Sequence, residues 1–274
     1  MPEGDTIWRT ARTLDAYLSG RGVTRFASTL PAVAAAARRL SILGRDIERV
    51  EARGKHLLVR FEGGAVLHTH MRMTGSWHMY RPNTPWRRPA YRARVVVEAG
   101  DVVAVCFDAP VVELLSAGEA AAHPALAALG PDVLSPAFDP DRARARIAAR
   151  GEAEIGSALL DQTALAGIGN IHKSEVLFLA RVNPFRRVSS LPPARLDRIV
   201  RTAAAHMKSH VEAGRADGPS PLWVYRRANR PCRRCGATIR RRVQGEEARA
   251  TYWCPVCQPL EDAVSAPAPR RRSR

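Results

Sequence analysis

The N-terminal part of the chain combines one amphipathic helix pattern with several short strand patterns. Residues 5–19 place Ile7, Ala11, Leu14 and Leu18 at helical spacing, which predicts a helix with one apolar face. Valine-rich runs separated by glycine or proline follow, a pattern typical of an antiparallel sandwich or barrel. These runs span residues 46–52, 56–62, 65–69, 93–98 and 102–107. We therefore interpret residues 1–117 as one β-sandwich domain with a flanking helix, and we place Cys106 in its core.

Helical patterns dominate the rest of the chain. Residues 118–138 are rich in alanine and proline, which favours a linker. Apolar periodicity then predicts helices over 139–150, 154–161, 170–180 and 192–213, so that residues 139–224 form a helical domain. A compact cysteine-bearing segment covers 225–260, and the arginine-rich residues 261–274 are expected to form a disordered basic tail.

Length and hydropathy limit the classes of protein that fit. The chain has 274 residues, of which 46% are hydrophobic and 25% charged, and this suits a globular protein of two domains or more. No apolar run approaches the roughly 18 residues that a membrane helix needs, and the start does not resemble a signal peptide. We expect a monomeric cytoplasmic protein with no membrane partner.

The net charge indicates a polyanionic partner. Forty-three basic residues against 26 acidic ones give a net charge of +17. The basic residues are all arginine except for three lysines, Lys55, Lys173 and Lys208. A GC-rich genome accounts for arginine in place of lysine, but it does not account for the excess of bases over acids. Such a surface gains affinity for nucleic acid by neutralising phosphates and releasing their counterions.

Four cysteines have the spacing of a metal site. Cys232 and Cys235 form one C-x-x-C pair, Cys254 and Cys257 form another, and 18 residues separate the pairs. This is the spacing of a four-cysteine zinc ribbon, and one structural Zn²⁺ can supply the folding free energy that so short a segment lacks. Two disulfides are the alternative, which a reducing cytoplasm disfavours.

A glycine-containing turn precedes the predicted helix over 170–180. Gly167 and Gly169 permit a tight turn, and Asn170 lies where an N-cap residue is expected. Free amides at the helix start, the Asn170 side chain and Lys173 one turn later would form a seat for a phosphate group. A turn that only joins two helices is the alternative.

The first residues offer an unusual nucleophile. Methionine is normally removed before a small residue such as Pro2, which leaves a secondary α-amine. An α-amine has a pKa of about 7.7–8.0, against about 10.4 for lysine, so more of it is unprotonated and able to attack a sugar carbon. Glu3 beside it could protonate a sugar oxygen, and Lys55 could supply a cation or an acid. The alternative is that these residues are merely the start of the chain.

These features together resemble the formamidopyrimidine-DNA glycosylase / endonuclease VIII family over nearly the whole chain. Four motifs occur in the family's order: Met1-Pro2-Glu3-Gly4, Arg53-Gly54-Lys55, Gly169-Asn170-Ile171, and Tyr252-Trp253-Cys254-Pro255-Val256-Cys257-Gln258. The resemblance implies an α+β multidomain fold, with an N-terminal antiparallel β-sandwich, a helix–two-turn–helix DNA-binding domain over 139–224 and a C-terminal zinc hairpin.

The resemblance also implies a bifunctional enzyme that excises a damaged base from double-stranded DNA and nicks the strand at the abasic site. Pro2 would form a Schiff base at C1′, Glu3 would act at the deoxyribose ring oxygen, and Lys55 would serve β-elimination. Arg249 matches the hairpin arginine that holds phosphates and is linked to δ-elimination, and Asn170 would hold phosphate.

Local departures from the family pattern bear on the lesion. Met73 matches the family's wedge loop, with Arg72 beside it. This loop does not separate the two branches of the family, because Met73 resembles the guanine-lesion branch and Trp77 resembles the endonuclease VIII-like branch. Gly4-Asp5-Thr6 and Phe107-Asp108-Ala109-Pro110 lack the pattern of the guanine-lesion branch, which favours an endonuclease VIII-like enzyme acting on oxidised pyrimidines. Preference for 8-oxoguanine or formamidopyrimidine is the alternative.

Two non-enzymatic interpretations share the charge and the cysteines. One is a zinc protein that recognises damaged DNA without cutting it, and the other is an RNA-associated zinc protein. Neither requires a free proline amine. His68 and His70 share one strand face upstream of the wedge loop, where packing or hydrogen bonding is expected rather than a metal pair.

Overall fold

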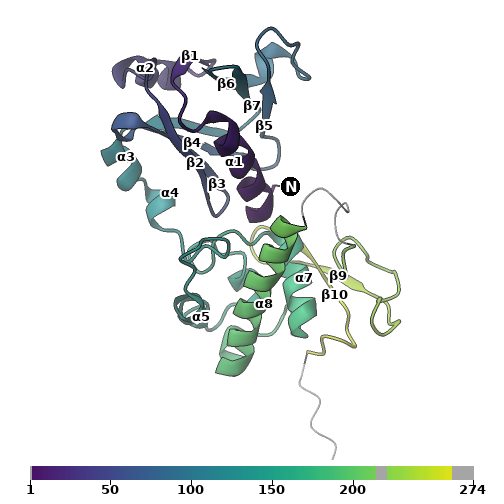
Figure 1. The fold of residues 1–274 in the computed structure, drawn as a ribbon. Coiled ribbons are helices and arrows are strands. Elements are labelled where there is room, and N and C mark those ends of the chain that lie inside the picture. The colour runs from purple at the N-terminus through teal and green to yellow at the C-terminus, as the bar shows by residue number, and fades with distance from the viewer. Residues whose placement is uncertain (1, 214–220, 261–274) are drawn as a thin grey trace, which may run out of the picture.

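The computed structural model describes residues 2–213 and 221–260, and it confirms the expected α+β fold (Figure 1). A β-sandwich with its flanking helix lies at one end, a helical domain lies at the other, and a two-stranded hairpin stands beside the helical domain (Figure 1). The tail expected over 261–274 lies outside the described residues. Among the described helices, none has both the length and the apolar character needed to cross a lipid bilayer.

Two four-stranded antiparallel sheets form the sandwich. One sheet has the order β1-β6-β7-β5 and the other β2-β3-β4-β8. Alternate residues of each strand face the shared core, as Leu57, Val59 and Phe61 do in β3 and Val95, Val97 and Ala99 do in β6. The bounds of the strands are β1 Val23–Ser28, β2 Ile47–Arg53, β3 His56–Phe61, β4 Val66–His70, β5 Ser76–Tyr80, β6 Ala93–Ala99, β7 Val102–Phe107 and β8 Val111–Leu115.

Four elements of the sandwich domain were not expected from the sequence. Strands β1, β5 and β8 and helix α2 (Pro31–Arg39) carry few fully buried residues. In α2 only Val33 and Ala36 are buried, so the apolar period is too weak to read. The three strands lie at sheet edges, where one neighbour is missing and polar side chains are tolerated. Cys106 is fully buried in β7, as expected.

The helical domain is built around α7 (Asn170–Ala180), which is buried on nearly every side. The long helix α8 (Pro193–Glu212) packs against it, and the shorter α5 (Pro140–Ala148) packs against α8. The helix expected over 154–161 is shortened to α6 (Ile155–Ala158), which contacts α7. Two short helices, α3 (Ala117–Ala121) and α4 (Pro124–Ala127), lie between the sandwich and this domain (Figure 1).

Helix α1 (Gly4–Leu18) joins the two domains. It packs against β2 on one side and against α8 on the other, so its first turn lies at their junction (Figure 1). The Asp15 carboxylate accepts a hydrogen bond from the Val50 amide at 2.6 Å, which fixes α1 on the sandwich. The Arg9 guanidinium donates to the His210 carbonyl at 2.9 Å, which fixes it on α8.

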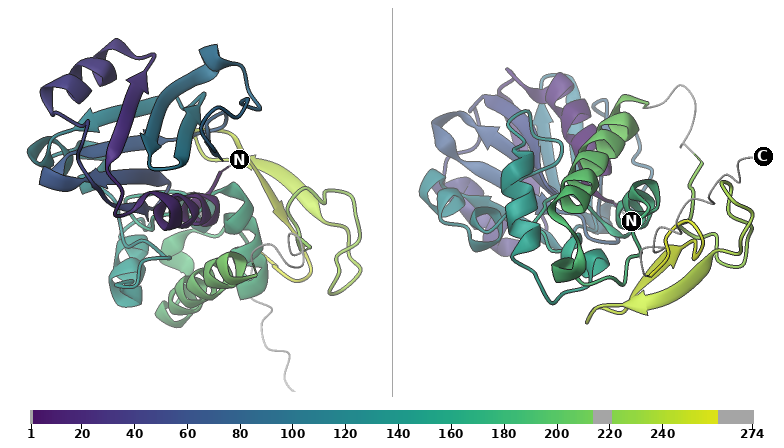
Figure 2. Two further views of the ribbon diagram at one scale, coloured as in Figure 1. Left: turned by 45° about the horizontal axis from the view of Figure 1, so that its top comes forward. Right: turned by 90° about the horizontal axis from the view of Figure 1, so that it is seen from below.

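The hairpin of β9 (Arg240–Gln244) and β10 (Arg249–Trp253) projects on the side of the molecule where the amino end of the chain lies (Figure 2). Buried polar side chains tie its segment to the helical domain. The Glu175 carboxylate of α7 accepts hydrogen bonds from three successive amides, those of Trp223, Val224 and Tyr225, at 2.7–3.0 Å. The Gln258 side chain donates to the Val182 carbonyl at 2.8 Å. The module's orientation therefore depends on directional bonds to α7 and the turn after it.

Candidate functional site

The Glu3 side chain lies at the amino end of α7. It is 1% exposed, and its two oxygens accept hydrogen bonds from the Ile171 amide at 2.8 Å and the His172 amide at 3.2 Å. These are orphan amides of the first helical turn, where the helix dipole also favours negative charge. A residue next to the chain start is thus held by a helix 168 positions later in the sequence.

Three glycines make this approach possible. The Gly4 amide donates to the Gly167 carbonyl at 2.9 Å, and a Cβ on Gly4 would lie only 2.7 Å from that oxygen. Gly167 has a φ of +96°, which side-chain-bearing residues rarely adopt. A Cβ on Gly169 would lie 2.2 Å from the Glu3 carboxyl carbon. The turn that we expected to seat a phosphate instead receives a carboxylate of its own chain, and the residue in the N-cap position is Gly169 rather than Asn170.

Pro2 is half-buried and comes directly before Glu3. Because Glu3 is fixed, the Pro2 ring is confined to the same junction of α1, α7 and the hairpin.

Lys55 reaches the site from the turn between β2 and β3. Gly54 has a φ of +59°, and its amide donates to the half-buried Asp132 carboxylate at 2.7 Å, which also accepts from the Leu134 amide at 3.0 Å. The pKa of Lys55 is lowered to about 8, chiefly by burial; the negative charge of Glu3 opposes this shift and the positive charge of Arg249 adds to it. The charges of Glu3, Lys55 and Arg249 therefore interact across three separate parts of the chain.

Asn170 and Arg249 lie where α7 meets the hairpin. The Asn170 amide nitrogen donates to the Ala250 carbonyl at 2.8 Å, while its buried Oδ1 has no hydrogen-bond partner. The Arg249 side chain is 38% exposed and pairs with Glu247 at 2.6 Å. An exposed arginine held by one exposed acid is available to a stronger anion such as a phosphate.

Lys173 lies elsewhere than we expected. Its side chain is completely buried, and its ammonium donates to the Thr251 hydroxyl at 2.6 Å. That hydroxyl in turn donates to Gln244 at 2.9 Å. Burial lowers the pKa of Lys173 to about 8. A side chain with no exposed surface cannot contact a phosphate, so Lys173 joins α7 to the hairpin and is not part of an anion seat.

The turn between β4 and β5 presents Arg72 and Met73 to solvent. Arg72 has a φ of +44°, and its amide donates to His70 Nδ1 at 3.2 Å. Met73 is 64% exposed. Trp77 is instead half-buried against the sandwich core, and its indole donates to the Thr69 hydroxyl at 3.1 Å. Of the two wedge candidates, Met73 is the one that projects.

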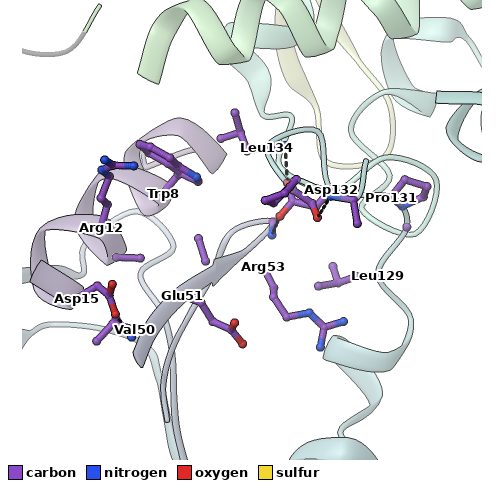
Figure 3. A pocket seen from close by; sticks show the side chains of 17 residues that line it. Trp8, Arg12, Asp15, Val50, Glu51, Arg53, Leu129, Pro131, Asp132 and Leu134 are labelled. Carbon is purple, nitrogen blue, oxygen red and sulfur yellow. Dashed lines mark hydrogen bonds between the residues drawn. The ribbon is translucent and has the colours of Figure 1, made fainter. Parts of the chain in front are cut away.

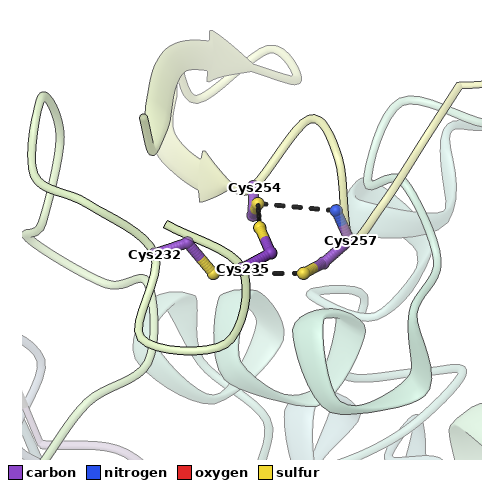
Figure 4. A group of neighbouring side chains, drawn as sticks. All are labelled: Cys232, Cys235, Cys254 and Cys257. Atoms are coloured by element: carbon purple, nitrogen blue, oxygen red, sulfur yellow. Dashed lines mark hydrogen bonds between the residues drawn. The ribbon is translucent and has the colours of Figure 1, made fainter. Parts of the chain in front are cut away.

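The four cysteines converge as their spacing indicates (Figure 4). All four are free thiols, with Sγ–Sγ distances of 3.9 Å for Cys232–Cys257 and 3.4 Å for Cys235–Cys254. Tetrahedral ligation with metal–sulfur bonds of about 2.3 Å places sulfurs about 3.8 Å apart. The four side chains can therefore hold a metal ion with small adjustments.

A separate pocket of about 550 Å³ lies between α1, β2 and the segment 129–137 (Figure 3). Trp8, Arg12, Glu51 and Arg53 line it, and Asp132 borders it. Pro2, Glu3, Lys55, Asn170 and Arg249 do not, so the pocket is distinct from the site described above.

Three residues of this region, Asp132, Glu175 and His172, were not predicted from the sequence. Asp132 lies in Gly130-Pro131-Asp132, which we read as linker, although an acid after Gly-Pro is a common means of binding nearby amides. Glu175 and His172 lie inside a helix, and only the fold shows that this helix is buried.

Comparisons with known proteins match these features. The formamidopyrimidine-DNA glycosylase N-terminal domain matches residues 1–109, and the formamidopyrimidine-DNA glycosylase H2TH domain matches residues 129–218. A probable endonuclease 8 2 of Streptomyces coelicolor is 42% identical, over 100% of this chain and 98% of that protein. The DNA-(apurinic or apyrimidinic site) lyase Nei2 of Mycolicibacterium smegmatis is 37% identical over 94% and 99%. A Lactococcus lactis formamidopyrimidine-DNA glycosylase, solved with DNA containing an abasic site, shares the fold with a TM-score of 0.80 at 24% identity, over 94% of this chain and 100% of that one.

Replacement of Gly169 by alanine is expected to displace Glu3 from α7. The backbone at Gly169 is extended and open to any residue, so the effect comes from the clash with the carboxyl group. Loss of two charge-assisted hydrogen bonds should lower stability by about 2–4 kcal/mol. Amide hydrogen exchange at Ile171 and His172 should accelerate, as measured by mass spectrometry, and the melting temperature should fall.

The matched control is Gly118→Ala, because a Cβ on Gly118 in α3 meets no atom within 4 Å. That variant should keep the parent melting temperature. Unchanged exchange and stability in Gly169→Ala would contradict the close approach of Glu3.

Proposed function

The chain belongs to the family of formamidopyrimidine-DNA glycosylases and endonucleases 8, and we infer that it is a DNA glycosylase and abasic-site lyase of base excision repair. Its partner is DNA that contains oxidised bases or abasic sites. The geometry that carries this function is the fixed position of Glu3 beside Pro2, with Lys55 and Arg249 in electrostatic contact.

We propose that Pro2, freed of Met1, is the nucleophile. Its nitrogen bonds to C1′ of the damaged nucleotide as the N-glycosidic bond breaks, and the base leaves as an anion that takes a proton from water. The Glu3 carboxylate accepts the proton that the Pro2 nitrogen loses. It then gives this proton to the ring oxygen as the C1′–O4′ bond opens, and the product is an iminium that joins Pro2 to the sugar. The two α7 amides support this role because they fix the carboxyl group against that first residue.

Lys55 is the proposed base for strand cleavage. The iminium makes C2′ acidic, and removal of the C2′ proton breaks the C3′–O3′ bond, which releases the 3′ phosphate. A lysine with a pKa of about 8 is partly neutral near physiological pH and can accept that proton. Arg249 lies close enough to lower that pKa, and we propose that it binds a phosphate beside the lesion and assists the second elimination.

The remaining site residues are proposed DNA contacts. The target nucleotide must leave the base stack to reach Pro2, and an apolar side chain must fill the gap. Exposed Met73 suits this wedge, with Arg72 at its side. The Asn170 amide nitrogen has two N–H groups and donates one of them to the Ala250 carbonyl, and we propose that the other binds a phosphate between α7 and the hairpin.

We propose that the metal on the four cysteines is one structural Zn²⁺ per chain. Four-thiolate sites of this spacing favour zinc, and the ion would supply folding free energy to the segment that carries the hairpin. Cys232, Cys235, Cys254 and Cys257 would hold the ion, while Glu175 and Gln258 orient the segment. The bacterial origin of the relatives supports a cytoplasmic, nucleoid-associated monomer.

The proposed lesion class is the oxidised pyrimidines. The relatives named endonuclease 8 2 in Streptomyces coelicolor and Mycobacterium bovis share 42% and 38% with this chain, against 33% for the formamidopyrimidine-DNA glycosylase of Symbiobacterium thermophilum. The endonuclease 8 1 of Mycobacterium bovis also shares 33%. At the loop after β7, Asp108 is held by Arg88 and Arg92 at 2.9 Å each, where the guanine-lesion branch carries an arginine of its own.

Borohydride reduction should trap the protein covalently on a duplex with an abasic site, because it reduces the iminium to a stable amine. An N-terminal extension left in place should abolish trapping while every side chain stays unchanged. The same extension at the C-terminus is the matched control and should leave trapping intact. Peptide mass mapping should locate the adduct on Pro2. Absence of both trapping and nicking by protein with a verified Pro2 terminus would favour a DNA-recognition protein without catalysis.

A duplex panel separates the two lesion classes. We expect excision of thymine glycol and dihydrouracil to exceed that of 8-oxoguanine by about tenfold or more, a difference of about 1.4 kcal/mol in barrier. Single-turnover rates at equal enzyme excess give the comparison, and the abasic duplex serves as the lesion-independent control. Faster release of 8-oxoguanine would assign the enzyme to the guanine branch.

The pH dependence of strand cleavage tests Lys55. Its pKa is lowered from 10.5 to about 8, so the neutral amine increases about tenfold per pH unit below 8 and levels off above it. Nicking of a preformed abasic site should follow this curve between pH 6 and 9. Lys55→Arg stays protonated across the range and should lose most of the rate and the rise.

The Pro2 amine titrates in the same range, so Schiff-base formation must be followed separately by the rate of borohydride trapping. That rate should keep its pH dependence in Lys55→Arg. Equal nicking profiles in the parent enzyme and the variant would exclude Lys55 as the base.

A further inference from the structure

Three histidines meet between α7 and α8, outside the groups assigned above. His172 comes from the first turn of α7, and His206 and His210 lie one turn apart on α8. One ring nitrogen from each lies within 4.8 Å of the others. The ring centres are separated by 5.2 Å, 5.0 Å and 4.4 Å. We call these three residues the α7–α8 histidine cluster.

Two nitrogens of this cluster, His172 Nδ1 and His206 Nε2, are buried and have no hydrogen-bond partner in the part of the chain that the structure describes. Buried polar atoms are nearly always satisfied by protein, water or an ion, so two unpaired ring nitrogens in one cluster require an explanation. Burial lowers the pKa of His206 to about 3 and also lowers that of His210, and neutral imidazole is the form that binds metal ions.

Asp5 sets the orientation of His172. Its carboxylate lies 3.1 Å from His172 Nε2, and the ion pair with Arg9 at 2.9 Å keeps that carboxylate charged. His172 therefore donates from Nε2 and leaves the Nδ1 lone pair directed away from Asp5. Histidines that bind metals commonly have this arrangement, in which the second ring nitrogen donates to a carboxylate.

We propose that the α7–α8 histidine cluster binds a second metal ion, a divalent transition metal such as Zn²⁺, and that Asp5 positions its His172 ligand. On a tetrahedral centre with metal–nitrogen bonds of about 2.0–2.1 Å, imidazole ring centres lie about 5 Å apart. The observed spacings fit this arrangement after small rotations of the rings.

Such an ion would brace the seat of Glu3. The His172 amide is one of the two that bind the Glu3 carboxylate. A metal ion that links the His172 ring to His206 and His210 would therefore fix the amino end of α7, where Glu3 is bound, against α8. The ion is assigned a positioning role, because it would act on Glu3 only through His172, whose ring Nε2 lies 3.8 Å from Glu3 Oε2.

A second histidine cluster in the sandwich does not carry the same inference. His68 Nδ1 and His123 Nε2 both lie near one oxygen of Glu113, at 2.8 Å and 3.0 Å, and His68 Nε2 lies 2.8 Å from His56 Nδ1. His123 Nδ1 has no partner among the described residues, but the nitrogens that face one another and Glu113 are already paired, so this cluster serves as the control.

Zinc content measures the proposal directly. Full-length protein without a histidine tag is dialysed against about 50 µM free Zn²⁺, an excess that fills a site of micromolar affinity. The metal and protein contents are then measured. The parent protein should hold two zinc ions per chain, one of them on the four cysteines. His206→Phe, which keeps a ring of similar shape, and His210→Ala should each hold one. His123→Ala should still hold two.

His210→Ala preserves the bond from Arg9, because Arg9 contacts the His210 backbone carbonyl, so this variant decides the matter if His206→Phe fails to fold. Zinc added beyond one equivalent should raise the melting temperature of the parent protein and not that of His210→Ala. One zinc ion per parent chain would overturn the proposal and assign buried water to the orphan nitrogens. Two ions in parent and cluster variants alike would also overturn it. Neither readout depends on catalysis.

Discussion

The interaction on which the functional structure depends is the pairing of the Glu3 carboxylate with two backbone amides of α7. It brings a residue of the sandwich domain's first helix to the central helix of the other domain. The other parts of the site then take their positions around it. The Gly4–Gly167 contact closes the backbone on one side, and the Lys55 turn closes it on another. Domain assembly and assembly of the reacting groups are the same event in this chain.

Basic side chains lie near Glu3 both in the interior and closer to the surface. Lys55 and buried Lys173 both have pKa values lowered to about 8, chiefly by burial, and both interact with Glu3. Arg249 stands farther out with 38% of its side chain exposed. Of the two inner charges, Lys173 joins α7 to the hairpin through Thr251 and Lys55 faces Glu3, while the outer one is paired only with exposed Glu247 among the described residues. A lysine-poor, arginine-rich chain thus keeps two of its three lysines for the centre of the molecule.

The sequence alone predicted the parts of the site that have rigid spacing or a distinctive turn. The cysteine pairs and the glycine turn before α7 meet this description, as does the Pro2-Glu3 start. It misplaced Lys173, because a lysine at the start of a helix normally reaches solvent and only the docking of β10 buries it. It also assigned the N-cap to Asn170, since it could not foresee that Glu3 would supply the capping carboxylate from 168 positions away. The roles of Asp132, Glu175 and His172 depend on contacts between distant segments, which local periodicity does not encode.

The bond from Gly54 to Asp132 couples the two domains mechanically. Gly54 belongs to the sandwich and Asp132 to the segment that leads into the helical domain, and Gly4 is joined in the same way to Gly167. Lys55 and Glu3 therefore each lie next to one of these two bonds across the domain boundary. A rotation that parted the two domains would strain both bonds together, so Lys55 and Glu3 keep their relative positions only while the two domains stay in contact.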